Sequence, residues 1–135
     1  MITHEASVRV RYVETDAMGI VHHSNYLVWF ELARVEMMDI LGLPYRKLEE
    51  QDCLLAVLES HVRYIKPSFF DDRLRVIVYV REKPRVRTEI EYEVLRKEEL
   101  LATGKTSHAF INRQGHPIKP PEVYVNAISK HFGKA

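Results

Sequence analysis

A single long helical pattern, set between one strand-like segment and a series of others, constrains the fold most. Apolar residues recur at steps of three and four along it: Tyr26, Trp29, Phe30, Ala33, Met37, Ile40 and Leu41. This spacing predicts one amphipathic helix about 24 Å long, broad enough to cover a sheet. Gly42 and Pro44 follow directly and are typical of a helix end.

Strand-like patterns lie on both sides of this helix. Alternation at Ala6, Val8, Val10 and Tyr12 predicts a first strand from Ala6 to Val13. Four later runs predict strands over Leu54–Ile65, Arg73–Lys83, Arg87–Arg96 and Leu100–Asn112, and short helices are expected over Tyr45–Gln51 and Glu122–Phe132. In the first of these strands, alternation places Leu54, Ala56, Leu58, Val62 and Tyr64 mostly on one face. Short turns between strands favour antiparallel pairing. We therefore expect an α+β fold, with residues 1–135 forming one domain.

One helix covers only one face of such a sheet. Ile77 and Tyr79 alternate with Val76 and Val78, so this run has large apolar side chains on both faces. An exposed apolar patch usually marks an interface. The pattern predicts a homodimer or a larger symmetric assembly, with the ligand site at the subunit boundary.

Composition excludes several classes of function. The net charge is +1, from 20 basic and 19 acidic residues, which does not favour nucleic acid as a partner. No apolar run approaches the length of a membrane span. The one cysteine, Cys53, has no partner for an internal disulfide and suits a reducing compartment. We expect a cytoplasmic protein without a membrane span.

The segment from Asp16 to Tyr26 carries the chemistry. Asp16 and Gly19 precede a helix start marked by Ser24 and Asn25, whose side chains are expected to cap the first N–H groups. A carboxylate beside free N–H donors can attack a carbonyl and stabilise the resulting oxyanion. In the alternative interpretation, Asp16 caps a turn and Gly19 supplies a positive φ angle.

These residues also resemble a known family. The motif is Asp16-x-x-Gly19-Ile20-Val21-His22-His23-x-x-Tyr26, followed by Glu31 and Arg34, and later by Tyr64-Ile65-Lys66-Pro67 with Asp71 and Asp72. It resembles the hot-dog-fold acyl-CoA thioesterases of the 4-hydroxybenzoyl-CoA thioesterase type, most closely the bacterial branch related to the Tol–Pal-associated thioesterase. The order of elements agrees from Ala6 to about Asn112.

The resemblance implies a hot-dog fold, in which a curved antiparallel sheet of about five strands wraps a long helix. It also implies dimers with a continuous sheet, often paired into tetramers. Asp16 would act on a thioester carbonyl as nucleophile or general base, and the backbone N–H of His23 would donate to the oxyanion. The substrate would be an acyl-CoA or an acyl-carrier thioester, with no cofactor besides the coenzyme A of the substrate.

Further residues are expected around the substrate. Gly19 would allow close approach of the thioester, and Val21, His22 and Tyr26 would help to form its site. Lys66 is a candidate for the phosphates of coenzyme A. A second candidate is the basic hairpin, by which we mean Arg81, Lys83, Arg85 and Arg87.

Other functions remain open from the residues alone. His22 and His23 have no third His or Cys at a ligand spacing, and His61 and His108 are isolated on strands, so no metal site is expected. A hot-dog dehydratase acting on a hydroxyacyl thioester is one alternative, although that chemistry needs a His and carboxylate pair. A non-catalytic acyl-thioester-binding protein is the other.

Overall fold

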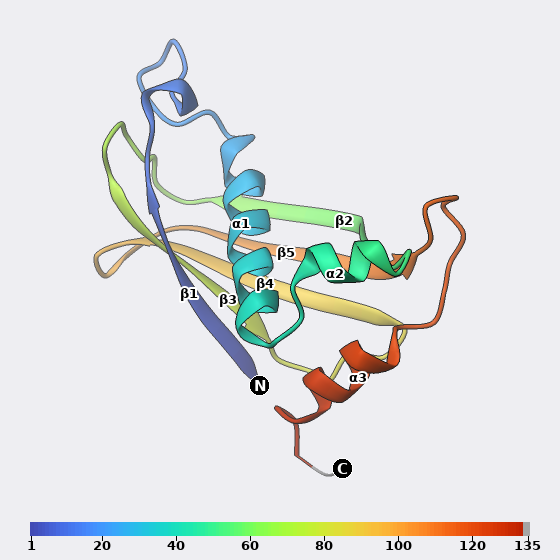
Figure 1. Cartoon of the computed structure of the whole chain (residues 1–135). Coiled ribbons are helices and arrows are strands. Elements are labelled where there is room, and N and C mark those ends of the chain that lie inside the picture. Colours follow the sequence, from blue (N-terminus) through green and yellow to red (C-terminus); the bar gives the residue numbers. More distant parts are fainter. Residues whose placement is uncertain (134–135) are drawn as a thin grey trace.

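The computed structural model describes residues 1–133 and contains one five-stranded sheet with three α-helices (Figure 1). The elements in chain order are β1 (Ile2–Arg9), η1 (Tyr12–Glu14), α1 (Asn25–Ile40), α2 (Tyr45–Glu50), β2 (Leu54–Tyr64), β3 (Arg73–Val80), β4 (Arg87–Arg96), β5 (Glu99–Ile111) and α3 (Glu122–Ser129). The predicted α+β architecture with one long helix and five strands is confirmed.

The sheet is antiparallel throughout, in the order β1-β3-β4-β5-β2. Strands β3, β4 and β5 form a meander at its centre, whereas β1 and β2 form its two edges. Figure 1 shows α1 running across the sheet, with α2 and α3 near its C-terminal end. The start of α1 and the loop before it therefore project beyond the covered part of the sheet.

The core lies between α1 and the sheet. Trp29, Phe30 and Ala33 of α1 are buried against strand residues such as Val76 and Val94. Phe30 stacks on Tyr92 with ring centroids 4.2 Å apart. A Cβ atom on Gly104 would lie 2.2 Å from the Phe30 ring, so only glycine at this position lets the ring lie flat against β5.

Three local predictions were wrong. The first strand ends at Arg9, and Tyr12 is 73 % exposed because the chain turns into a 3-10 helix there. Ile40, which was predicted to lie on the buried face of the helix, is exposed at the end of α1, whereas Met38 is buried. In β2 the register with β5 shifts between Val57 and Glu59, so alternation does not continue through Leu58.

The helix-free face of the sheet is more polar than predicted. Ile77 and Tyr79 are only partly exposed, and they lie beside charged neighbours such as Glu93, which accepts a hydrogen bond from the Tyr79 hydroxyl. Exposed apolar side chains gather instead on the outer side of α1: Leu27, Val28, Leu32 and Val35. The expected apolar surface exists, but it lies on the helix.

A chain of polar groups is buried under α1. The Thr106 hydroxyl lies 2.6 Å from the Tyr92 hydroxyl and 2.7 Å from Nε2 of His108. His108 is fully buried, and its Nδ1 has no hydrogen-bond partner among the described residues. Burial, helped by the charge of Arg34, lowers the pKa of His108 from 6.5 to about 4.

This burial predicts a loss of stability in acid. Because the pKa of folded His108 lies below that of the unfolded chain, its contribution is present above pH 6.5 and is lost as the pH falls toward 4. Below both pKa values, the free energy of unfolding is lower by on the order of 3 kcal/mol than it is near pH 7. Urea unfolding at pH 7 and pH 4.5 should show a larger loss for wild type than for His108→Gln. A matching change at exposed His61 should leave the wild-type pH dependence intact. Equal losses in wild type and His108→Gln would contradict the assignment.

Candidate active site

The loop that carries Asp16 is a closed turn. A bridge between Thr15 and Val21 joins its ends, and Asp16 N–H donates to the Ile20 carbonyl at 2.9 Å. Asp16 Oδ1 accepts from Met18 N–H at 2.8 Å, and Gly19 has φ +79°. Asp16 is therefore fixed by its own turn, as the alternative interpretation held, and glycine is required by the backbone angle. Oδ2 of this half-exposed carboxylate has no partner within residues 1–133.

Glu14 anchors this loop to α1. It is only 3 % exposed, and its carboxylate accepts from Trp29 Nε1 at 2.9 Å and from Arg11 N–H at 2.8 Å. Its carbonyl accepts from His22 N–H at 2.8 Å and from Asn25 Nδ2 at 2.9 Å. Sequence analysis missed Glu14. Glu14 directly follows the strand predicted to end at Val13, and a charged residue at that position gave no signal of burial.

The start of α1 differs from the predicted capping. Ser24 makes no side-chain cap, because its hydroxyl lies 2.8 Å from Nδ1 of His22. Asn25 directs its amide back to the carbonyls of Glu14 and His22. The backbone N–H of His23 has no acceptor within the described residues. It is thus a free donor at the positive end of a helix dipole, where negative charge is favoured.

The segment that follows β2 forms the opposite side. Val21 N–H donates to the Ser68 carbonyl at 2.9 Å, and the Ser68 hydroxyl lies 2.7 Å from that of Tyr26. Tyr64 donates its hydroxyl to the His23 carbonyl at 3.0 Å. Burial raises the pKa of Tyr26 and that of Tyr64. Both tyrosines therefore stay neutral at ordinary pH and act as fixed supports. Ser68, which is fully buried, was also missed by sequence analysis.

A cavity of about 440 Å³ opens between these two segments. It is lined by Asp16, Met18, Ile20, Val21, His23, Tyr26, Tyr64, Ile65, Lys66 and Pro67. The structure thus brings together five of the residues expected at the site: Asp16, Val21, His23, Tyr26 and Lys66. Gly19 and His22 do not line the cavity: Gly19 shapes the loop, and His22 contacts the Ser24 hydroxyl instead.

The two candidate phosphate sites differ in position. Lys66 lines the cavity, although its Nζ lies 2.8 Å from Glu99 Oε2. The basic hairpin follows Val80, at the far end of β3 from Asp72, and eight strand residues separate them by about 25 Å. The basic hairpin therefore does not reach the Asp16 cavity of its own chain.

The mouth of the cavity is apolar and open. Met18 is 79 % exposed, and Tyr64 and Ile65 on the other side of the cavity are also exposed. Phe69 and Phe70, a few residues further along the chain, are exposed as well.

Within residues 1–133, no three His, Cys, Asp or Glu side chains lie close enough together to hold a metal ion. In the same part of the chain, no helix is long and apolar enough to cross a membrane.

Comparison with known proteins agrees with this geometry. Residues 10–128 match the thioesterase-like superfamily. An acyl-CoA thioesterase of Haemophilus influenzae is 33 % identical over 119 residues, covering 86 % of this chain and 88 % of that protein. A putative acyl-CoA thioesterase of Bacillus subtilis is 32 % identical over 108 residues, covering 79 % and 78 %.

Solved structures extend the similarity to the fold. The DHNA-CoA thioesterase of Staphylococcus aureus superimposes with a TM-score of 0.92 at 33 % identity, covering 97 % of this chain and 91 % of that one. The prediction of a hot-dog thioesterase is confirmed. The chain belongs to the thioesterase-like superfamily and has its hot-dog fold.

Proposed function

We propose that this protein hydrolyses an acyl-CoA thioester to the free acid and coenzyme A, with Asp16 as the catalytic carboxylate. One observation carries the proposal. Asp16 and His23 line the same cavity, and the His23 N–H has no acceptor within the described residues, which supports a carboxylate and an oxyanion donor acting on one substrate. The names of the relatives in Haemophilus influenzae and Bacillus subtilis support acyl-CoA as the substrate.

Asp16 has two routes to the same products. As general base, it takes a proton from water while the water oxygen attacks the carbonyl, and the C–S bond then breaks. As nucleophile, its free Oδ2 attacks the carbonyl, the thiolate leaves, and water hydrolyses the mixed anhydride. Single turnover in ¹⁸O-labelled water tests the nucleophilic route, because label found in the Asp16 carboxylate requires attack of water on the aspartyl carbon of the anhydride.

The surroundings support this chemistry. Met18 N–H donates to Oδ1 of Asp16, and Oδ2 has no partner within residues 1–133. Gly19 allows the turn that presents Asp16, and Val21 and Tyr26 form the wall. Lys66 is the cation available to a phosphate of coenzyme A, in exchange for Glu99. No cofactor beyond the coenzyme A of the substrate is part of this proposal.

We also infer a homodimer formed through β2, acting in the cytoplasm as one hot-dog domain. Strand β2 pairs with β5 on one side only, and its other edge carries unpaired backbone groups. Val57, Leu58 and Tyr64 are exposed along it. A second copy paired there would continue the sheet and approach the apolar mouth of the Asp16 cavity. Two such dimers could form a tetramer through the exposed apolar side of α1.

Asp16→Asn should lower turnover about 100-fold or more, because asparagine keeps the size but is neither a base nor an ionised nucleophile. Release of thiol from acetyl, octanoyl, palmitoyl and aromatic CoA esters measures it. Asp39→Asn, on the exposed side of α1, is the matched control and should retain wild-type rates. Equal rates for wild type and Asp16→Asn would remove Asp16 from the mechanism.

His23→Pro should also reduce kcat, by about 10²–10³-fold, because proline lacks the N–H that would bind the oxyanion. His23→Ala keeps this N–H and should lose much less. Thermal unfolding of both variants checks that the start of α1 is intact. Similar losses in kcat for the two variants would assign the effect to the imidazole ring instead.

Sedimentation equilibrium should give the mass of a dimer or of a dimer of dimers. Leu58→Arg places like charges near the middle of two paired β2 strands and should weaken association at least tenfold. Val86→Arg, in the exposed turn between β3 and β4, should have no effect. A monomeric wild type, or assembly unaffected by Leu58→Arg, would contradict the inferred interface.

A further inference from the structure

The start of α1 leaves one backbone donor unused. His23 lines the Asp16 cavity, and its N–H has no acceptor among the described residues. The neighbouring N–H groups each have an acceptor: His22 donates to the Glu14 carbonyl, Ser24 to Nδ1 of His22, Asn25 to the His22 carbonyl, and Tyr26 to the His23 carbonyl. Within residues 22–26, a single N–H is therefore left for a ligand.

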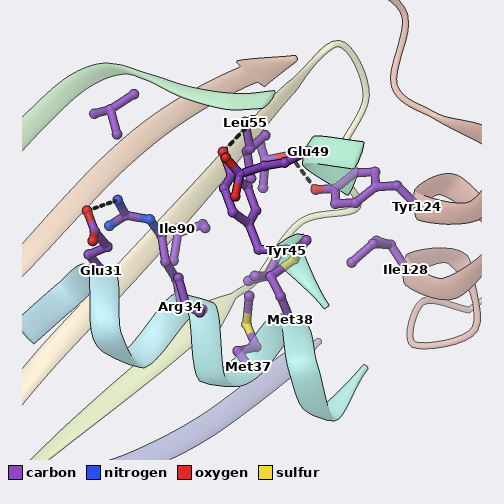
Figure 2. A pocket seen from close by; sticks show the side chains of 14 residues that line it. Glu31, Arg34, Met37, Met38, Tyr45, Glu49, Leu55, Ile90, Tyr124 and Ile128 are labelled. Atoms are coloured by element: carbon purple, nitrogen blue, oxygen red, sulfur yellow. Dashed lines mark hydrogen bonds and ion pairs between the residues drawn. The ribbon is translucent and has the colours of Figure 1, made fainter. Parts of the chain in front are cut away.

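The opposite end of α1 is built differently. Around the cavity drawn in Figure 2, Arg34 contacts Glu31 Oε2 at 3.7 Å, and the Tyr45 hydroxyl accepts from Leu55 N–H at 2.9 Å. Both contacts join polar groups of the chain to each other. The unused donor of His23 therefore sets the start of α1 apart.

The side chain of Asn25 contacts the peptide unit that carries this donor. Nδ2 of Asn25 donates to the Glu14 carbonyl at 2.9 Å and to the His22 carbonyl at 3.1 Å. Both facing groups are acceptors, so the nitrogen of the amide, and not its oxygen, must point to them. The His22 carbonyl also accepts from the backbone N–H of Asn25 at 3.0 Å. One residue thus supplies two donors to this carbonyl.

The His22 carbonyl and the His23 N–H belong to the same peptide unit. A trans peptide is planar, and its C=O and N–H point in opposite directions. Holding the carbonyl with two donors therefore fixes the direction of the N–H. Donation to the carbonyl also polarises the peptide, which makes its N–H a stronger donor.

The Asn25 amide is itself attached to the core. Its second acceptor, the Glu14 carbonyl, belongs to a residue whose buried carboxylate accepts from Trp29 Nε1 at 2.9 Å. On the other side of the turn, the Tyr64 hydroxyl donates to the His23 carbonyl at 3.0 Å. The peptide unit between His22 and His23 is therefore held by groups whose own positions are fixed by packing.

We propose that Asn25 is a positioning residue for thioester hydrolysis, whose side-chain amide orients the His23 N–H and strengthens it as the donor to the oxyanion. This inference rests on the proposed hydrolysis, in which that N–H binds the oxyanion. Asn25 does not line the Asp16 cavity. It acts on the reaction through the His22–His23 peptide unit and not by contact with the substrate.

Asn25→Ala tests this role, because it removes both side-chain donors, adds no charge and introduces a residue that favours helix. With the CoA ester that wild type hydrolyses fastest, kcat should fall about tenfold or more and KM should change less than about twofold, since a misdirected donor fails mainly in the transition state. Asn126→Ala, at an exposed position of α3, is the matched control and should retain wild-type kcat. Unchanged kcat in Asn25→Ala would overturn the proposal.

Octyl-CoA, a thioether without a carbonyl group, checks the binding surface separately. This ligand has no oxygen for an oxyanion donor, so its affinity by calorimetry should be the same for wild type and Asn25→Ala. Asn25→Ser, a residue type favoured at helix starts, guards against loss of the helix start and should also lower kcat. A fall in octyl-CoA affinity as large as the fall in kcat would assign Asn25 to the general shape of the site and refute its positioning role.

A combination with His23→Pro asks whether Asn25 acts through this N–H. Proline has no N–H, so in the His23→Pro background the change Asn25→Ala should lower kcat by less than about twofold. If the two losses multiply instead, Asn25 acts independently of the His23 N–H, and the proposal is wrong.

A measurement without turnover tests the geometry. The ¹⁵N order parameter of the His23 N–H should be near the rigid-backbone value of about 0.85 in wild type and in Asn126→Ala, and lower in Asn25→Ala. Equal order parameters in all three would overturn the proposal. Active wild type with unchanged kcat in Asn25→Ala would reject only the role of Asn25. Wild type inactive on every ester would reject the hydrolysis, and the order parameters would still decide whether Asn25 holds this peptide.

Discussion

The buried carboxylate of Glu14 is the contact on which the arrangement of the active site depends. This carboxylate, in η1, accepts from the indole of Trp29 in the core and from Arg11 N–H, and the backbone carbonyl of Glu14 accepts from His22 and Asn25. An unpaired buried carboxylate would be costly, so its hydrogen bonds fix the position of Glu14. The Asp16 turn is thereby held against α1.

The sequence predicted the elements well where one face is buried continuously. The apolar spacing of α1 and the alternation of β3 and β4 correspond to real buried faces, so bounds and faces agree closely. Prediction failed where local geometry overrides alternation: at the 3-10 turn of Tyr12 and at the register shift beside Leu58. Neither leaves a distinct pattern in composition.

The candidate site was predictable in part for a related reason. Asp16, Gly19 and His23 are close in the chain, so their grouping needs only a turn and a helix start. Ser68 reaches Tyr26 only because the segment after β2 folds back onto the Asp16 loop. Contacts of this kind join residues that are far apart in the chain, so they can be identified only once the fold is known.

The order of strands in the sheet also bears on how the chain reaches this state. The central meander of β3, β4 and β5 needs only short turns and can form locally. Each edge strand instead pairs with a strand far along the chain: β1 pairs with β3, and β2 pairs with β5. Closing such long loops is the slow part of folding. The segments that flank the Asp16 cavity follow these two edge strands, so we expect the candidate site to be among the last parts of the molecule to fold.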